Sequence, residues 1–288
     1  MEYTKLSNEV EMPMLGYGVF QIDNAETERC VSDAIACGYR LIDTAQSYGN
    51  EEGVGAAIAK SGVAREDLFI VDKVWPTNYR ADRAAASIDA SLKALGTDYI
   101  DLMILHQPFG DTYSAWRALE DAYKAGKVRA IGVSNFNPAE LRDLAFFNEI
   151  APMLNQVETH VFWQQKPARE NMDELGVQHM SWGPFAEGAN NFFENPLLAQ
   201  IGAKYGKGVG QVALRYLLDM GVVVIPKSTK KERMAQNIDV FDFALTDDER
   251  AAIAELDTGK SVCFDHSDMN IVKWLFDFIG KQLEAERA

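Results

Sequence analysis

Residues 100–134 read IDLMILHQPFGDTYSAWRALEDAYKAGKVRAIGVS, and this stretch contains one complete unit of the pattern that decides the fold. It begins with an apolar run, 100–106, of the length of a buried strand. In the segment that follows, apolar residues recur every three or four positions, which is typical of an amphipathic helix. Gly126 is predicted to end this helix, because glycine adopts the left-handed conformation at little steric cost. A second strand-like run begins at once, at 128–134.

The same alternation of strand-like runs and amphipathic segments continues almost from one end of the chain to the other. Eight runs are predicted to be strands: Leu15 to Phe20, Arg40 to Asp43, Leu68 to Lys73, Ile100 to His106, Val128 to Ser134, Pro152 to Gln156, Val177 to Trp182 and Val222 to Pro226. Six glycines are predicted to end helices: Gly38, Gly62, Gly96, Gly126, Gly176 and Gly221. Apolar strands separated by helices indicate a parallel sheet covered by helices. Eight such units favour an α/β fold of the (β/α)8 TIM barrel type, with an open doubly wound sheet as the alternative.

No shift in composition divides the chain, so we expect one barrel domain over 1–288 with additions at both ends. Residues 1–12 are predicted to form a β-hairpin that plugs the barrel floor. The segment 183–196 is long enough to be a lid, and further helices are expected at 247–256 and after Asn270. The last helix has Ile271, Trp274, Leu275, Phe278 and Ile279 on one face. We expect that face to pack on the barrel.

The composition excludes several classes of protein. Acidic residues outnumber basic ones 43 to 28, giving a net charge of −15, so nucleic acid is a poor candidate partner. No apolar stretch approaches the roughly 20 residues that a membrane span needs, and the N-terminus lacks a signal pattern. Three scattered cysteines do not form a disulfide framework. We expect a cytoplasmic protein without membrane contact, and no feature of the sequence indicates an obligate protein partner.

Polar residues stand at the ends of nearly all the predicted strands. In a barrel of this type the active site lies where the strands end, so these residues are the candidates for chemistry. They are Asp43, Lys73, His106, Ser134 with Asn135, Gln156, and Lys227 with Ser228. One such residue could be a simple cap, whereas a series of them favours a functional site.

Four of the ionisable residues form a set that could protonate a carbonyl group. Tyr48 follows Asp43 in the next loop, and a phenol has a pKa of about 10 in water. A nearby Lys73 ammonium would stabilise the phenolate and lower that pKa toward working pH. Asp43 would supply the counter-charge for Lys73, and His106 could orient a substrate oxygen by a hydrogen bond.

These residues stand in motifs that resemble those of the aldo-keto reductase family. The motifs are LIDTAQSYGNE at 41–51, KVW at 73–75, LHQP at 105–108, GVSNF at 132–136, NQVE at 155–158 and IPKS at 225–228. They occur in order over nearly the whole chain. The sequence is most similar to the shorter bacterial members, including the diketogluconate reductase-like and glyoxal reductase-like enzymes.

The resemblance implies a barrel enzyme that reduces aldehydes or ketones with NADPH and without a Rossmann domain. The chain accordingly lacks a complete Gly-x-Gly-x-x-Gly motif, since Gln21 stands where the third glycine would follow Gly16 and Gly18. By analogy, Tyr48 is the general acid, tuned by Lys73 and Asp43, and His106 positions the small carbonyl substrate. The residues expected to hold the nicotinamide are Ser134, Asn135, Gln156 and Trp182, the last by stacking.

The other end of the cofactor is expected at a basic segment, 227–233, of an otherwise acidic chain. Local positive charge attracts a phosphate, which favours NADPH over NADH. In the family, positions matching Lys227, Ser228 and Arg233 bind the 2′-phosphate, and those matching Gln236 and Asn237 contact the adenine. The candidates for the substrate pocket are Phe20, Trp75, His106 and Phe109, with Phe264 from the C-terminal loop as a further one.

Three residues depart from the family pattern: Asp72, Trp163 and Gly183. Strand alternation should direct Asp72 away from Lys73, toward the helices, where a buried carboxylate needs a partner that the sequence does not identify.

Two alternative functions remain open at this stage. One is an NADPH-binding redox sensor with little turnover, and the other is an aldolase that forms a Schiff base through Lys73. A metal site is not expected, because the four histidines show no ligand spacing.

Overall fold

The computed structural model describes residues 1–285 and confirms the predicted (β/α)8 barrel. The barrel strands are β3 (Tyr17–Gly18), β4 (Leu41–Asp43), β5 (Phe69–Val74), β6 (Leu102–Leu105), β7 (Ile131–Ser134), β8 (Leu154–Glu158), β9 (Gln178–Trp182) and β10 (Val223–Val224). Each strand pairs in parallel with the next one along the chain. Leu15, just before β3, pairs in parallel with Val224 of β10 and so closes the sheet. The closure excludes the open doubly wound alternative.

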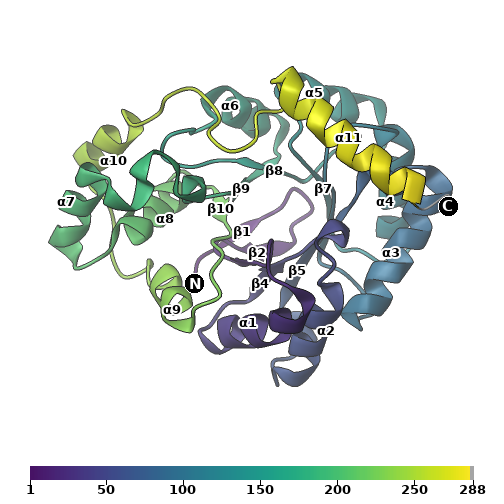
Figure 1. Cartoon of the computed structure of the whole chain (residues 1–288), viewed down its shortest axis with the longest axis horizontal. Helices are drawn as coiled ribbons and strands as arrows, with labels where there is room; N and C mark the ends of the chain where they lie inside the picture. Colours follow the sequence, from purple (N-terminus) through teal and green to yellow (C-terminus); the bar gives the residue numbers. More distant parts are fainter. Residues whose placement is uncertain (286–288) are drawn as a thin grey trace.

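A ring of helices surrounds the strands (Figure 1). The helices that alternate with strands are α1 (Asn24–Ala36), α2 (Glu51–Lys60), α3 (Ala81–Leu95), α4 (Thr112–Lys124), α5 (Pro138–Phe147), α6 (Lys166–Leu175), α8 (Val209–Asp219) and α9 (Lys231–Ile238). The additional helices are α7 (Pro196–Tyr205), α10 (Asp247–Ala254) and α11 (Met269–Ala285). Short 3-10 turns are η1 (Gln46–Tyr48), η2 (Arg65–Asp67), η3 (Pro76–Asn78) and η4 (Ala186–Glu194). The predicted helix at 247–256 is thus confirmed as α10.

The glycines predicted to end helices have the backbone conformation that this role requires. All six have a positive φ, between 63° and 104°. A side chain at such a position would strain the backbone, so glycine allows each helix to stop and the chain to enter the next strand within a few residues. These stops bring the carboxyl ends of the strands to one end of the barrel.

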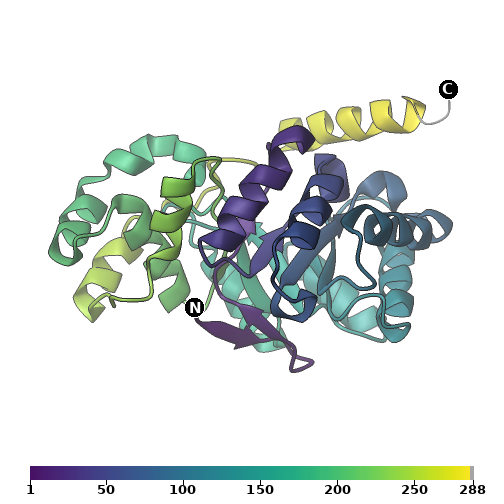
Figure 2. The ribbon, with the colours of Figure 1, turned by 90° about the horizontal axis from the view of Figure 1, so that it is seen from below.

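The predicted N-terminal hairpin closes the end of the barrel at which the strands begin. Strand β1 (Tyr3–Lys5) pairs antiparallel with β2 (Glu11–Pro13). Asn8, in the hairpin turn, donates a hydrogen bond to the carbonyl oxygen of Arg129 before β7. Met12 is fully buried beneath the strands. The hairpin and α11 lie on opposite sides of the barrel (Figure 2), so the end where the strands finish is the open one.

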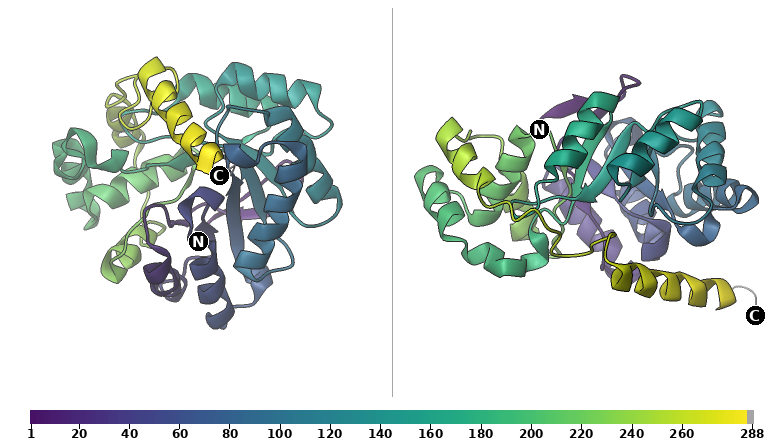
Figure 3. Two further views of the ribbon diagram at one scale, coloured as in Figure 1. Left: turned by 45° about the vertical axis from the view of Figure 1, so that its right-hand side comes forward. Right: turned by 90° about the horizontal axis from the view of Figure 1, so that it is seen from above.

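The C-terminal helix lies beside this open end (Figure 3), and its orientation corrects the sequence prediction. Leu275 and Ile279 are buried, as expected. Trp274 and Phe278 were expected on the same packed face, yet they are 57% and 42% exposed. The reason is that α11 rests on the barrel along a narrow stripe only. The aromatic residues beside that stripe face the barrel mouth instead of a core.

The segment predicted to be a lid forms η4 and its flanking turns. Phe192 anchors it, because this side chain is fully buried against Phe162 and Phe185. Residues 286–288, which the predicted single domain includes, lie outside the described residues. Within 1–285, no helix is both long enough and apolar enough to cross a membrane.

Candidate active site

Asp43, Lys73 and Tyr48 meet at the open end of the barrel. Asp43 ends β4 and Lys73 lies near the end of β5, and both side chains are buried. The Lys73 Nζ donates hydrogen bonds to Asp43 Oδ1 at 2.5 Å and to the Thr44 carbonyl oxygen at 2.7 Å. The same Nζ lies 5.0 Å from the centroid of the Tyr48 ring. The sequence-predicted cluster therefore exists as one group of contacting side chains.

The structure corrects the predicted direction of the Tyr48 pKa. Burial of the phenol raises its pKa to about 12, and the attraction of Lys73 for the phenolate, which acts in the opposite sense, does not overcome this. The sequence reveals the lysine but not how completely the barrel mouth removes the phenol from water. At neutral pH Tyr48 thus keeps its proton and is available as a proton donor.

Lys73 remains a cation despite being buried. Burial by itself lowers the pKa of the ammonium, but Asp43 and Tyr48 outweigh it and the pKa lies above its ordinary value. The Asp43 Oδ2 in turn accepts a hydrogen bond from Gln156 Nε2 at 2.8 Å. Both oxygens of this carboxylate are therefore engaged, and the lysine is held in one position.

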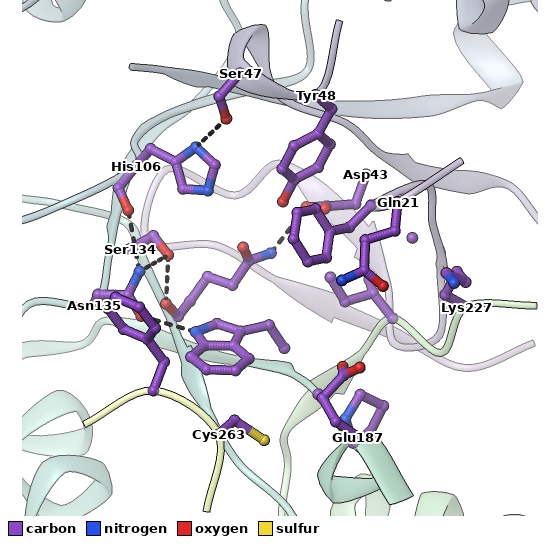
Figure 4. Close-up of a pocket in the computed structure, with 18 of the residues that line it drawn as sticks. Gln21, Asp43, Ser47, Tyr48, His106, Ser134, Asn135, Glu187, Lys227 and Cys263 are labelled. Atoms are coloured by element: carbon purple, nitrogen blue, oxygen red, sulfur yellow. Dashed lines mark hydrogen bonds between the residues drawn. The ribbon is translucent and has the colours of Figure 1, made fainter. Parts of the chain in front are cut away.

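His106 is a neutral imidazole at the side of the same cavity. Burial, together with the nearby Lys73 charge, lowers its pKa well below the ordinary value. Its ring stands edge-on to Tyr48 at 5.6 Å and to Trp75 at 5.1 Å between centroids. The Ser47 hydroxyl lies 3.4 Å from His106 Nδ1, while the other ring nitrogen faces the side where the Tyr48 hydroxyl lies (Figure 4).

Ser134 and Asn135 lie together beside the cluster (Figure 4), and hydrogen bonds connect them to Gln156 and Trp182. The Ser134 hydroxyl donates to the Gln156 carbonyl oxygen at 2.8 Å. Asn135 Nδ2 donates to the His106 carbonyl oxygen, and Asn135 Oδ1 accepts from the Trp182 indole at 2.8 Å. Asn135 has a positive φ of 66°, a conformation that asparagine tolerates better than most residues. This turn directs the amide back across the strand ends.

The predicted phosphate-binding residues are only partly brought together. Lys227 and Arg233 line the same cavity as Tyr48. Ser228 is buried, and its hydroxyl accepts from the backbone N–H of Lys230. Gln236 and Asn237 lie on α9 outside the cavity lining.

The cavity has a volume of about 640 Å³, and both the cluster around Tyr48 and the basic segment contribute to its lining. Of the residues predicted to contact substrate, Phe20, Trp75 and His106 line it. Phe109 lines a neighbouring cavity of about 440 Å³.

Sequence reasoning missed several lining residues in the part of the chain after residue 186: Glu187, Phe193, Cys263, Trp274 and Phe278. The one available signal was the pair of aromatics one helical turn apart in α11. The sequence analysis assigned this pair to the core.

Asp72, a departure from the family pattern, has identifiable partners. Its Oδ1 accepts a hydrogen bond from the Lys73 backbone N–H at 2.8 Å, and Ser91 and Glu51 lie against its side chain. Burial and the neighbouring Glu51 carboxyl raise its pKa well above the ordinary value. Both effects favour the neutral carboxyl group, which is the form that burial behind β5 tolerates better.

Glu158, at the end of β8, fastens the C-terminal loop over the cavity. A carboxylate oxygen of Glu158, a ring nitrogen of His160 and the Sγ of Cys263 lie within 4.8 Å of one another, a spacing that could hold a metal ion. The carboxylate already accepts five hydrogen bonds: from His160 Nε2, Ser261 Oγ and the backbone N–H groups of Val262, Cys263 and Phe264. These donors hold the pKa of Glu158 down at about 2 against the effect of burial. This group is therefore better explained as a structural anchor than as a metal site.

The closed barrel and the polar cluster at its strand ends define an oxidoreductase of the barrel type. Residues 14–258 match the Aldo/keto reductase family, and the chain belongs to this family. It is thus an NADP(H)-dependent aldo-keto reductase, as the motifs had predicted.

Relatives of known sequence span nearly the same length as this chain. It is 46% identical over 260 residues to the glyoxal reductase of Bacillus subtilis (strain 168), covering 90% of this chain and 94% of that protein. It is 41% identical over 259 residues to methylglyoxal reductase DkgA of Escherichia coli (strain K12), covering 89% and 94%.

Two solved structures share the fold. The Bombyx mori aldo-keto reductase in complex with NADP superimposes with a TM-score of 0.88 at 36% identity, over 93% of this chain and 96% of that one. An aldo/keto reductase from Brucella melitensis gives a TM-score of 0.86 at 41% identity, over 89% and 99%.

Proposed function

We propose that this protein reduces small aldehydes or ketones to alcohols with NADPH as the hydride donor, and that Tyr48 protonates the carbonyl oxygen. The observation that carries the proposal is the position of the Lys73 ammonium. It lies 5.0 Å from the Tyr48 ring and is held there by Asp43. The names of the bacterial relatives, glyoxal reductase and methylglyoxal reductase, support a small carbonyl substrate.

The proton step follows from the charges around Tyr48. With a pKa of about 12, the buried phenol is protonated before reaction. As the carbonyl oxygen gains negative charge, its basicity rises and it takes the proton. The phenolate left behind faces the Lys73 ammonium, which stabilises it in a site with little water. Asp43 keeps the lysine charged and in place.

His106 supplies the second hydrogen bond to the substrate oxygen. Being neutral, the imidazole carries one N–H. The Ser47 hydroxyl can donate to Nδ1, which leaves the proton on the ring nitrogen that faces the cavity. A donor fixed in this way stabilises the developing alkoxide without reorganisation.

The cavity lining supports NADPH bound along it, with Gln236 and Asn237 reaching the cofactor from outside that lining. When bound, NADPH supplies the hydride. Neutral donors and acceptors on Ser134, Asn135 and Gln156 would hold the nicotinamide carboxamide, with Trp182 against the ring. At the other end, the exposed cations Lys227 and Arg233, with Ser228 between them in sequence, would bind the 2′-phosphate. Gln236 and Asn237 would contact the adenine from α9.

The two alternative functions are less well supported. A Schiff-base aldolase needs an uncharged amine, whereas Lys73 is ion-paired at 2.5 Å and its pKa is raised. An NADPH-binding sensor with little turnover needs no catalytic acid, whereas all four residues of the cluster are present and in contact.

The direct test follows NADPH consumption at the nicotinamide absorbance band with a panel of aldehydes, dicarbonyls and keto sugars. We expect turnover with NADPH, and slower turnover with NADH. Binding of NADPH without turnover of any carbonyl would favour the sensor, and covalent trapping of a substrate by borohydride would favour the aldolase.

A further inference from the structure

Helix α11 is fixed over the barrel mouth through Trp75. Leu275 and Ile279 of the helix form a small apolar cluster with this indole. The Trp75 Nε1 also donates a hydrogen bond to Gln282 Oε1 at 2.7 Å. Because Trp75 comes two residues after Lys73, the helix is attached directly to the strand that carries the catalytic lysine. The position of α11 relative to the catalytic cluster is therefore well defined.

This attachment presents two aromatic rings of α11 to the cavity. Trp274 and Phe278 are one helical turn apart, and their rings are nearly parallel, with 7° between planes and 5.8 Å between centroids. Both line the cavity that contains Tyr48 and His106, and the edge of Trp274 meets Phe264 at 5.9 Å. They remain 57% and 42% exposed.

Other residues that line the cavity are also aromatic. Phe20, which lies against Tyr48 at 5.0 Å between ring centroids, is 51% exposed, and Phe193 of η4 is 58% exposed. Exposing rings of this size to water is unfavourable, and a cluster of them around one cavity is typical of a ligand-binding surface.

Charge is distributed unevenly along the cavity. The acidic and basic residues of its lining are Asp43, Glu187, Lys227 and Arg233, and none of them comes from α11. The three lining residues that α11 contributes, Trp274, Leu275 and Phe278, are all uncharged and apolar. A substrate group that meets α11 therefore finds flat apolar surfaces and no counter-ion for a carboxylate or phosphate.

We propose that Trp274 and Phe278 form a binding face for a planar apolar substituent, so that the enzyme prefers arylalkyl carbonyl compounds to small hydrophilic ones. This inference rests on the proposed carbonyl reduction. It concerns a helix that begins beyond residue 258, where the family match ends, so it follows from this chain's own residues. The aryl ring lies against the Trp274 and Phe278 faces while the carbonyl oxygen is between Tyr48 and His106.

The test compares substrates with the same reacting group. Hydrocinnamaldehyde and propanal are both unconjugated aldehydes and differ by a phenyl ring, and the cyclohexyl analogue of hydrocinnamaldehyde tests whether the ring must be planar. We expect kcat/KM for hydrocinnamaldehyde to exceed that for propanal roughly tenfold or more, since ring burial and ring contacts each contribute. The cyclohexyl analogue should fall between the two.

Substitutions in α11 test whether its aromatic residues cause the preference for hydrocinnamaldehyde over propanal. Trp274→Ala and Phe278→Ala should each lower kcat/KM for hydrocinnamaldehyde about fivefold to tenfold, mainly through KM, and leave propanal within about twofold. Trp274→Phe should retain most of the preference. The matched control is Phe276→Ala, because Phe276 is a half-exposed aromatic of the same helix that contacts Phe109 and does not line the cavity. It should leave the ratio of the two substrates unchanged.

Two further measurements distinguish a change in substrate preference from a loss of folding or of cofactor binding. Thermal unfolding and NADPH affinity, measured by protein fluorescence, should be close to wild type in every variant. If neither aldehyde is reduced by the wild type, the proposed function fails and the inference falls with it. If both are reduced with similar kcat/KM, or if the variants leave the ratio unchanged, only the role of α11 is overturned.

Discussion

The indole N–H of Trp75 is hydrogen-bonded to the side-chain oxygen of Gln282, so one residue connects the catalytic strand to the C-terminal helix. The same indole stands edge-on to His106 at 5.1 Å. Trp75 thus contacts both the residue proposed to orient the carbonyl oxygen and the helix proposed to select the rest of the substrate. The two parts of the site are coupled through this single side chain.

Replacing Gln282 should therefore loosen α11 without touching the catalytic cluster. Gln282→Leu removes the acceptor of a buried N–H and should lower the free energy of unfolding by about 1 to 2 kcal/mol. Because the aromatic face would lose its fixed position, KM for hydrocinnamaldehyde should rise while kcat is largely retained. Denaturant unfolding and steady-state kinetics measure both effects, with Lys281→Gln, at an exposed position on the same helix, as the control. An unchanged KM would show that the bond does not position the helix.

Tyr48→Phe tests the proton donor. It should lower kcat for carbonyl reduction by roughly a thousandfold or more, because it removes the hydroxyl held beside the Lys73 ammonium. NADPH affinity should be unchanged, since the lost hydroxyl belongs to the substrate side of the cavity. Stopped-flow measurement of a single turnover isolates the chemical step. Retention of more than about a tenth of the wild-type rate would assign the proton to another group.

The fold was predictable because its signals are local. Each strand is a short apolar run and each helix has a regular apolar spacing, so that barrel, hairpin and helix-ending glycines follow from neighbouring residues alone. The catalytic cluster was predictable for a related reason. In a parallel barrel all strands end on one side, so Asp43, Lys73 and His106 must converge whatever their separation in sequence.

The orientation of α11, the partner of Asp72 and the Tyr48 pKa were not predictable, because they depend on contacts between residues far apart in the sequence. Helical periodicity groups Trp274 with Leu275. Only the angle at which α11 rests on Trp75 decides that Leu275 is buried while Trp274 remains 57% exposed. In the same way, Asp72 on β5 lies against Glu51, which is the first residue of α2. The Tyr48 pKa depends on how far the phenol is removed from water, a property of the assembled barrel mouth.

The preference for NADPH should depend on Arg233. Loss of a charge-assisted hydrogen bond to the 2′-phosphate is expected to raise the Kd for NADPH about 10- to 100-fold in Arg233→Ala, with little effect on NADH. Lys231→Ala is the matched control, because this neighbouring cation forms an ion pair with Asp33 at 3.0 Å and does not line the cavity. Fluorescence titration with both cofactors measures the change. Equal weakening of NADPH and NADH would contradict the assignment.

The raised pKa of Asp72 leads to a prediction about pH and stability. Its pKa lies well above the ordinary value of 3.8 in the folded chain, so at intermediate pH the folded state binds a proton that the unfolded state has lost. Stability must then fall as pH rises from about 4 toward the folded-state pKa, by up to about 1.4 kcal/mol per pH unit for this one proton. The stability of the Asp72→Asn variant should not fall for this reason, because an amide at this position cannot ionise. Relative to wild type, the variant should gain stability progressively with rising pH, and below about pH 4 the difference should be constant.

Urea unfolding of both proteins at several pH values between about 4 and 8 measures this difference directly. Asp67→Asn, which replaces an exposed carboxyl just before β5, is the matched control. If wild type and Asp72→Asn instead keep a constant difference, Asp72 is ionised in the folded state. The carboxyl would then be a fixed negative charge directly behind Lys73. It would add to the charge of Asp43 in stabilising the ammonium and would weaken the stabilisation that Lys73 gives to a Tyr48 phenolate.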